Sequence, residues 1–268
     1  MDGRRLMDAI YRVDGNCVVT SPDAAGPWDA TMQHGSAPAG LAVWAAEAIP
    51  TPEPMAIARV TIDLMRPVPL APLTIQTEIL RQGRKIQLCA VRLLAGDVVV
   101  VGATVLKIRT QALTLPPDVA DQRLELPGPD QSRVEKVDFS SSPFVTGISL
   151  RAASGRFGVP GPGAIWYRGD RPLSEGSVVS QAMRAVVAAD FCNGTSPALD
   201  FREWTFINAD LTVSFARQPI GEWILLDAES MVGPDGAGLA MARLADAGGY
   251  FGRVVQSLVI EKRVKTTD

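Results

Sequence analysis

Two stretches of the chain alternate apolar and polar residues in the manner of half-buried strands. In the first stretch, Val60, Ile62 and Leu64 alternate with polar neighbours. Further strands are expected in the first stretch over 73–80, 86–94 and 98–108, and in the second over 209–216, 223–229, 239–244 and 253–260. Turns bearing proline or glycine separate these segments. Each stretch therefore predicts four strands joined by short turns.

One apolar helix is expected before each set of strands. Residues 36–48 repeat apolar side chains at helical spacing, and Ser36 is the expected N-cap. Residues 177–190 show the same spacing through Val179, Ala182, Val186 and Ala189. Both segments are rich in alanine and poor in charge, which is typical of a buried helix.

The two halves are related by an internal repeat. Residues 113–137 are rich in proline and lack apolar periodicity, as a linker does. A shift of 151 residues aligns Arg66 with Arg217, Glu78 with Glu229, Arg92 with Arg243 and Leu93 with Leu244, and a shift of 152 aligns Leu106 with Leu258 and Ile108 with Ile260. This shared spacing predicts a duplication. The expected organisation is a first unit over 1–112, the linker over 113–137, a second unit over 138–263 and a tail over 264–268.

A buried helix wrapped by a long antiparallel sheet, present twice, is the double hot-dog arrangement. We therefore expect an α+β fold of two tandem units. The two sheets are expected to pair edge to edge, because unpaired sheet edges favour aggregation and natural proteins cover them.

The charge and the single histidine exclude several function classes. The net charge of −3 offers no basic excess for a nucleic-acid partner. His34 is the only histidine, so a multi-histidine metal centre cannot be built within one chain. The sequence also lacks the G-x-S-x-G nucleophile motif and glycine-rich phosphate loops.

Cysteine usage and hydropathy bear on the compartment. The three cysteines are dispersed and form no C-x-x-C motif, which indicates reduced thiols. Met1–Arg5 lacks the apolar core of a signal peptide, and no apolar run reaches the roughly 18 residues of a membrane span. We expect a cytoplasmic protein with no membrane partner.

Several motifs carry a family resemblance. The first-half segment Trp28-x5-His34-Gly35 resembles the entry to the first helix of double hot-dog acyl-CoA thioesterases, and Arg66-Pro67 resembles the turn that follows. In the second half, 208–213 and Gly221-Glu222-Trp223 are similar to the C-terminal signature of that family. The resemblance covers nearly the whole chain outside the linker, and it is strongest to the acyl-CoA thioesterase II-like group.

The resemblance implies a function and a site. That family hydrolyses fatty acyl-CoA without a metal or a cofactor, using an Asp, a hydroxyl residue and a Gln. Asp190 and Gln256 match two of these positions, and Asn208 stands at the hydroxyl position. We call these three residues the polar trio. The resemblance implies that Asp190 acts as general base and that Asn208 and Gln256 position the water, although nucleophilic attack by Asp190 itself stays open.

The residues themselves leave alternatives open for two members of the trio. Asp190 ends an apolar helix, and the negative helix end would favour uptake of a proton by its carboxylate. Asp190 could equally cap the loop that follows. Gln256 lies on an apolar strand face, so a buried amide there needs a partner, which is either the reacting water or a neighbouring backbone group.

Three further residues are expected to bind substrate. Asn208 and Asp210 should share one strand face by alternation, although a structural hydrogen bond is the other interpretation of Asp210. His34 and Gly35 directly precede the first helix. They are expected to contact the thioester, while a hydrogen bond that fixes the loop is the alternative role of His34.

The repeat predicts one working site per chain, because the first copy has about Glu47, Ile57 and Thr104 where the second has the polar trio. Acyl-CoA is the expected partner, and a homodimer or higher homo-oligomer is a further expectation. Two other function classes stay open. One is a non-catalytic acyl-CoA or acyl-carrier binding protein, and the other is a hot-dog hydratase or dehydratase, which would require His34 to work with a carboxylate.

Overall fold

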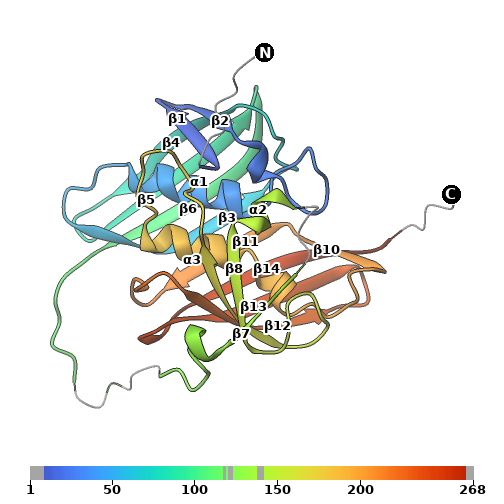
Figure 1. Cartoon of the computed structure of the whole chain (residues 1–268). Helices are drawn as coiled ribbons and strands as arrows, with labels where there is room; N and C mark the ends of the chain where they lie inside the picture. Colours follow the sequence, from blue (N-terminus) through green and yellow to red (C-terminus); the bar gives the residue numbers. More distant parts are fainter. Residues whose placement is uncertain (1–8, 117–118, 120–122, 138–141, 264–268) are drawn as a thin grey trace.

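A computed structural model describes residues 9–116, 119, 123–137 and 142–263. The expected tail over 264–268 and the segment Met1–Arg5 lie outside these residues. Within the described residues, 14 strands form one antiparallel sheet that runs through both halves of the chain (Figure 1). No helix in this part of the chain is long and apolar enough to cross a membrane.

The first unit has one long helix and six strands. In sheet order the strands run β1-β2-β4-β5-β6-β3. The elements are β1 (Tyr11–Asp14), β2 (Cys17–Thr20), the short helix η1 (Pro22–Ala24), α1 (Ser36–Glu47), β3 (Met55–Leu64), β4 (Leu73–Gln82), β5 (Ile86–Ala95) and β6 (Val98–Arg109).

The second unit repeats this order from the junction outward, as β11-β14-β13-β12-β9-β8-β7, with β10 also paired to β14. Its elements are η2 (Pro129–Gln131), β7 (Arg133–Val134), α2 (Pro143–Thr146), β8 (Ile148–Ser154), β9 (Gly163–Gly169), α3 (Gln181–Ala189), α4 (Cys192–Thr195), β10 (Trp204–Asn208), β11 (Asp210–Phe215), β12 (Ile224–Val232), β13 (Ala237–Asp246) and β14 (Gly249–Lys262). The predicted α+β fold of two tandem units is confirmed.

The two sheets meet edge to edge, as predicted, through β3 and β11. Thr61 lies directly opposite Thr212 in this ladder, and the two hydroxyls are hydrogen-bonded at 3.3 Å. The two residues differ by the 151 positions of the internal repeat. The junction therefore lies where the repeat places a local twofold axis, and each unit covers the open edge of the other.

The repeat keeps one register throughout. β3 has an irregularity between Ile57 and Arg59, and the equivalent strand of the second unit is interrupted at Ala209, between β10 and β11. The ladders place Thr104 opposite Thr61 and Val255 opposite Thr212, so Val255 is the counterpart of Thr104.

The predicted shift of 152 for the last strand is therefore wrong. The irregularity lies in the partner strands, so no residue is inserted into β14 relative to β6. The counterpart of Gln256 is Val105 and not Thr104. Val105 is fully buried like Gln256, which fits two residues that point to the same side of the sheet.

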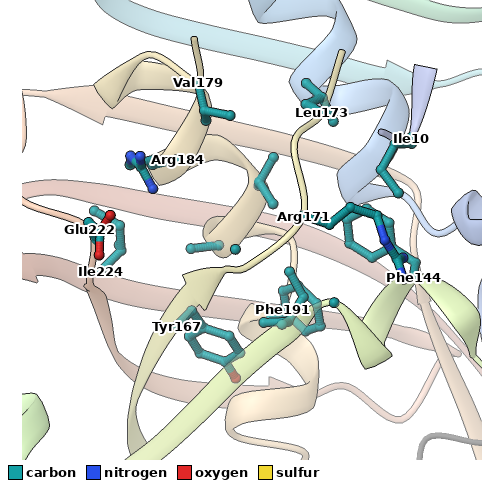
Figure 2. Close-up of a pocket in the computed structure, with 15 residues that line it drawn as sticks. Ile10, Phe144, Tyr167, Arg171, Leu173, Val179, Arg184, Phe191, Glu222 and Ile224 are labelled. Atoms are coloured by element: carbon teal, nitrogen blue, oxygen red, sulfur yellow. The ribbon is translucent and has the colours of Figure 1, made fainter. Parts of the chain in front are cut away.

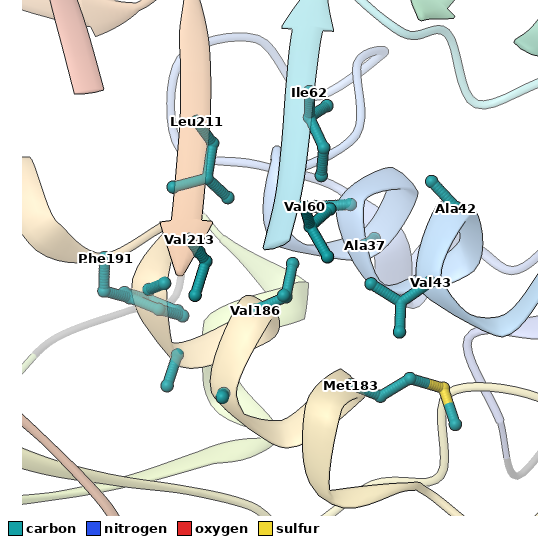
Figure 3. Close-up of a cluster of buried hydrophobic side chains, with 14 of the residues drawn as sticks. Ala37, Ala42, Val43, Val60, Ile62, Met183, Val186, Phe191, Leu211 and Val213 are labelled. Atoms are coloured by element: carbon teal, nitrogen blue, oxygen red, sulfur yellow. The ribbon is translucent and has the colours of Figure 1, made fainter. Parts of the chain in front are cut away.

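The two long helices pack against each other on one face of the sheet (Figures 1 and 3). Their contact includes Gly40 of α1. A side-chain carbon at this position would lie 2.8 Å from Leu173 and 2.9 Å from Val187, so only glycine permits this approach. Figure 3 shows Val43, Met183 and Val186 between the helices, over the junction strands. The helices thus fill the space beneath both halves of the sheet.

The helix starts differ slightly from the prediction. The first helix has Gly35 as its N-cap, so Ser36 is already helical and its hydroxyl is available for another partner. The second starts at Gln181, four residues later than expected, because the Ser180 hydroxyl accepts a hydrogen bond from the Met183 N–H and caps the helix there.

Candidate active site

A buried carboxylate lies where the C-terminus of α3 meets the N-terminus of α1. Asp190 is the C-cap of α3 and is 5% exposed. The Asn208 amide donates to Oδ1 of Asp190 at 2.9 Å, and the Ser36 hydroxyl donates to Oδ2 at 3.0 Å. We call this cluster the Asp190 corner. It joins residues of both units around one carboxylate.

Gly35 is part of the Asp190 corner for a steric reason. A side-chain carbon on Gly35 would lie 2.9 Å from Oδ2 and 3.0 Å from Oδ1 of Asp190. Such a contact is closer than van der Waals packing permits, so the carboxylate occupies the space that any other residue would need. The structure thus brings Gly35 next to the predicted base.

His34 lies between two phenylalanine rings and touches the carboxylate. Its ring stacks on Phe144 with centroids 4.9 Å apart and on Phe191 with centroids 4.8 Å apart. His34 Nδ1 lies 3.3 Å from Oδ2 of Asp190, and the Ser36 N–H points to the same nitrogen at 3.2 Å. Nδ1 donates to Asp190 when protonated and accepts from Ser36 when unprotonated, so one proton selects between two hydrogen-bond arrangements.

Two helix ends of opposite sign act on Asp190. The prediction considered only the negative end of α3, whereas the positive end of α1 also faces this carboxylate through Gly35 and Ser36. Within the described residues, His34 is the only basic side chain that contacts Asp190. The negative charge of Asp190 is therefore held by neutral donors, a helix end and one imidazole.

Gln256 is hydrogen-bonded to the backbone that carries Asp190. Its side chain is fully buried, its Nε2 donates to the Asp190 carbonyl at 3.1 Å, and its Oε1 accepts from the Asn193 N–H at 3.1 Å. These bonds tie β14 to the turn between α3 and α4. The amide thus has the backbone partners that were one of the two interpretations of its sequence position.

Asp210 is not brought to the Asp190 corner. The break at Ala209 disrupts the alternation, so Asn208 reaches Asp190 while Asp210 accepts a hydrogen bond from the Ser257 N–H at 2.5 Å. The next residue, Leu211, is buried on the core side. The prediction that Asn208 and Asp210 share a face is therefore wrong, and the structural interpretation of Asp210 fits its hydrogen bond.

Cys192, two residues after Asp190, is fully buried. Burial, together with the nearby Asp190 charge, raises the pKa of its thiol far above the ordinary value. The thiolate is the nucleophilic form of cysteine, so Cys192 is not suited to attack a substrate. Among the residues described, no group of three or more His, Cys, Asp or Glu side chains could hold a metal ion.

A second corner lies at the opposite ends of the two helices. There, Ser180 at the start of α3 is hydrogen-bonded to the carboxylate of Glu47. Glu47 is exposed as a residue, but partial burial of its carboxyl raises the pKa of that group. We call this pair the Glu47 corner. The C-cap of α1 is Ala48, and the register places Ile57 and Val105 where the second unit has Asn208 and Gln256. The Glu47 corner therefore lacks the amides of the polar trio.

Comparisons with known proteins identify the family. The family model of the acyl-CoA thioesterase N-terminal domain matches residues 24–108, and that of the C-terminal domain matches 117–260. The chain belongs to the acyl-CoA thioesterase family. It is a thioester hydrolase, and the resemblance drawn from its motifs is confirmed.

Solved structures share the fold of this acyl-CoA thioesterase. A protein assigned as a thioesterase II from Thermobifida fusca is 17% identical, with 96% of this chain and 97% of that chain covered and a TM-score of 0.73. A hot-dog protein from Alicyclobacillus acidocaldarius is 15% identical, with 96% and 98% covered and a TM-score of 0.72. The acyl-CoA thioesterase II TesB2 of Mycobacterium marinum is 14% identical, with 96% of each chain covered and a TM-score of 0.64. No curated protein matches the chain.

A cavity runs along α3 of this acyl-CoA thioesterase and is lined near the end of that helix by Phe191, the residue after Asp190 (Figure 2). It is narrow, with a cavity volume of about 50 Å³. Its lining is mostly apolar and comes from α3, β8, β9, the start of β12 and the segment between β9 and α3. Phe144 and Phe191, which enclose His34, are both part of its wall. The two rings thus lie between the cavity and His34, which contacts the carboxylate.

Several residues of the site were not predicted from the sequence. Ser36 was assigned only as a helix cap, although its position two residues after His34 places it in the same helix entry. Phe144 stands in no motif, and the Asn193-Gly194-Thr195 glycosylation pattern does not point to this site, so both residues reach the corner only through tertiary contacts. Phe191 directly follows Asp190, and that adjacency was the one available signal.

Proposed function

We propose that this thioesterase hydrolyses fatty acyl-CoA to the free fatty acid and CoA, with Asp190 as general base. The observation that carries the proposal is a buried carboxylate held by Asn208 and Ser36 at the positive end of a helix. Such a group has fixed geometry, is shielded from bulk solvent and lies 3.3 Å from His34 Nδ1, close enough to exchange a proton. Asp190 is therefore the group suited to activate a water molecule.

In the proposed reaction, Asp190 takes a proton from a water that Asn208 orients, and the water oxygen attacks the thioester carbonyl. The carbonyl oxygen becomes negatively charged, and we assign the Gly35 N–H at the start of α1 as its donor. The carbon–sulfur bond then breaks, and the proton held by Asp190 passes to the leaving thiolate of CoA. Gln256 keeps the Asp190 backbone in place and does not contact the substrate.

The fatty chain is assigned to the cavity along α3. Its walls include Leu173, Val187 and Ile224, and burial of each methylene contributes about 0.8 kcal/mol. Because the Phe144 and Phe191 rings link this space to His34, an acyl chain inside it would bring its thioester to the Asp190 corner.

Thiol release from short, medium and long acyl-CoAs tests the proposal. We expect turnover that rises with chain length until the cavity is filled. The matched oxygen ester of a fatty alcohol should react far more slowly, since the site is fitted to a thioester with a CoA leaving group. Absence of thiol release from every acyl-CoA in the panel contradicts the proposal, and release from carrier-protein thioesters alone would move the substrate class from CoA to a carrier.

One observation favours a second candidate, a hot-dog hydratase. The 3.3 Å contact of His34 with Asp190 gives the chain the His–carboxylate pair that such enzymes use. A hydration assay with an enoyl-CoA checks this candidate. The loss of the enoyl absorbance in the ultraviolet measures the reaction. We expect no hydration, because the family match assigns the thioester bond as the reacting group.

A further inference from the structure

Arg184 is part of the wall of the cavity along α3, at the end of the cavity away from Phe191. Arg184, Val187 and Ala188 recur at helical spacing i, i+3 and i+4, so all three lie on the side of α3 that lines the cavity, and Phe191, just beyond the end of α3, lines it too. With a rise of 1.5 Å per residue, Arg184 lies about 8 Å along the helix axis from Ala189, the last residue of α3, and Phe191 follows two residues later. A medium-length acyl chain that starts at Phe191 would therefore end beside a guanidinium group.

Arg184 has no partner for its charge in the described part of the chain. Its Nε is buried without a hydrogen bond, and no carboxylate forms an ion pair with its guanidinium. An unpaired, partly buried cation is unfavourable unless a ligand completes it. Glu222 lies at the same end of the cavity (Figure 2), yet it is exposed and forms no ion pair with Arg184.

The second arginine of the cavity is already engaged. Arg171 lies 3.7 Å from the Asp23 carboxylate and donates to the Pro143 carbonyl at 3.4 Å. Arg184 is thus the cavity cation available to a ligand among the described residues.

We infer that the cavity takes an acyl chain that ends in a carboxylate, and that Arg184 binds this terminal group. The substrate class is a medium-length dicarboxylic acid joined to CoA through one of its carboxyl groups, and this inference rests on the proposed function. A guanidinium is planar and binds a carboxylate through two parallel hydrogen bonds, which fits recognition of a terminal carboxylate at the end of an apolar cavity. The apolar walls hold the methylene groups between the thioester and the terminal carboxylate.

The phosphates of CoA are the other anions that Arg184 could meet. In that case the pantetheine arm would fill the cavity, and its two amides would need hydrogen-bond partners there. The Tyr167 hydroxyl is already paired with Thr195 at 2.7 Å, and the remaining walls are mainly apolar side chains. Pantetheine amides would therefore stay unpaired, so the observations favour the acyl chain.

Binding of thioether analogues, which cannot be hydrolysed, tests the inference. Calorimetric titration compares the analogue of suberoyl-CoA with that of octanoyl-CoA, because the two chains differ only in the terminal carboxylate. We expect wild type to prefer the suberoyl analogue by about tenfold or more, as for a charge-assisted hydrogen bond. Arg184→Met should abolish or reverse this preference, and Arg184→Lys should keep part of it. Equal preference in wild type and Arg184→Met overturns the inference.

A pair of neighbouring valines tests occupancy of the cavity. Val179 lines the cavity, whereas Val178 is 89% exposed and does not. Val179→Trp should weaken the binding of both analogues by about tenfold, because the added ring fills the space of several methylenes. Val178→Trp should leave both affinities within about twofold. Equal effects of the two substitutions would place the acyl chain elsewhere.

Binding of free CoA shows whether Arg184 binds a CoA phosphate or the terminal carboxylate of the acyl chain. If Arg184 met a CoA phosphate, Arg184→Met would weaken free CoA and both analogues alike, and the inference would fall. We expect free CoA binding to be unchanged. Because binding needs no turnover, chain-end preference without thiol release would keep this inference and contradict the proposed function. Thiol release without chain-end preference would do the reverse.

Discussion

α1 and α3 run in opposite directions, so each end of the helix pair brings a serine of one helix to a carboxylate of the other. Ser36 donates to Asp190 at one end, and Ser180 is bonded to Glu47 at the other. Among the described residues, only the Asp190 corner adds a histidine and an amide to this pair, whereas Glu47 has the charge of the buried Lys107 nearby. The two ends therefore share the serine–carboxylate pair and differ in the polar groups around it.

The strand residues next to each corner explain the difference in polarity between the two corners. Asn208 and Gln256 correspond to Ile57 and Val105, which are buried apolar side chains in the first unit. Apolar packing stabilises a core without needing partners, while buried amides require complete hydrogen bonding. Apolar packing thus surrounds the Glu47 corner at these two positions, and hydrogen-bonded amides surround the Asp190 corner, as expected of a single reaction site.

The largest expected effect comes from removing the carboxylate charge at each corner. Asp190→Asn should lower kcat by about a hundredfold or more, since a general base of this kind contributes that amount. Glu47→Gln, the matched change at the other corner, should leave kcat within about twofold. Thiol release measured with equal amounts of folded protein, checked by circular dichroism, gives the comparison. Equal losses in both variants would contradict a single working site.

The second largest effect is expected when Asn208 is replaced by isoleucine, the residue type at the corresponding position Ile57 of the first unit. Asn208→Ile should lower kcat by about tenfold to a hundredfold, because one hydrogen bond to a charged group is lost. Asp210→Asn is the control, since Asp210 bonds the Ser257 N–H on the other side of the strand break. Steady-state kinetics of the two variants check this. A larger loss from Asp210→Asn would return Asp210 to the substrate site.

A smaller effect is expected from crowding the carboxylate. Gly35→Ala places a carbon about 3 Å from both Asp190 oxygens and should lower kcat by about tenfold with little change in melting temperature. In the first unit, a carbon added to Gly102 meets nothing within 4 Å, so Gly102→Ala is the control and should keep full activity. A Gly35→Ala variant as active as wild type would show that Asp190 need not hold this position.

The smallest effect is a pH dependence of stability at the Glu47 corner. Burial raises the pKa of Glu47 above its ordinary value of 4.5. A carboxyl whose pKa is raised by folding contributes stability below pH 4.5 and loses it as the pH rises through the folded pKa. The free energy of unfolding of Glu47→Gln minus that of wild type should therefore rise from pH 4 to pH 7. Urea unfolding at the two pH values measures this gain, and a constant difference would show that the Glu47 carboxyl is not desolvated.

The repeat and the long strands were predictable because both rest on spacing along the chain. The 151-residue shift and the helix over 36–48 match the structure within a residue or two. The short strands β1, β2, β7, β8, β9 and β10 were missed. Strands of two to seven residues give too few alternations to distinguish a strand from a loop.

The geometry of the site was only partly predictable. Asp190 and Asn208 were expected together, and they are hydrogen-bonded. The face of Asp210 was predicted wrongly because a strand break leaves no signal in apolar alternation. The placement of Phe144 beside His34 depends on packing between the units, which a single sequence does not encode locally.

The number of substrate sites per chain tests the central claim most directly. Calorimetric titration of the protein with a thioether analogue of a medium-chain acyl-CoA measures this number without turnover. One working corner predicts a stoichiometry of about one analogue per chain, with binding strongly reduced when Val179→Trp fills the cavity beside that corner. Two equivalent analogues per chain would show that the Glu47 corner also binds substrate and would contradict the account.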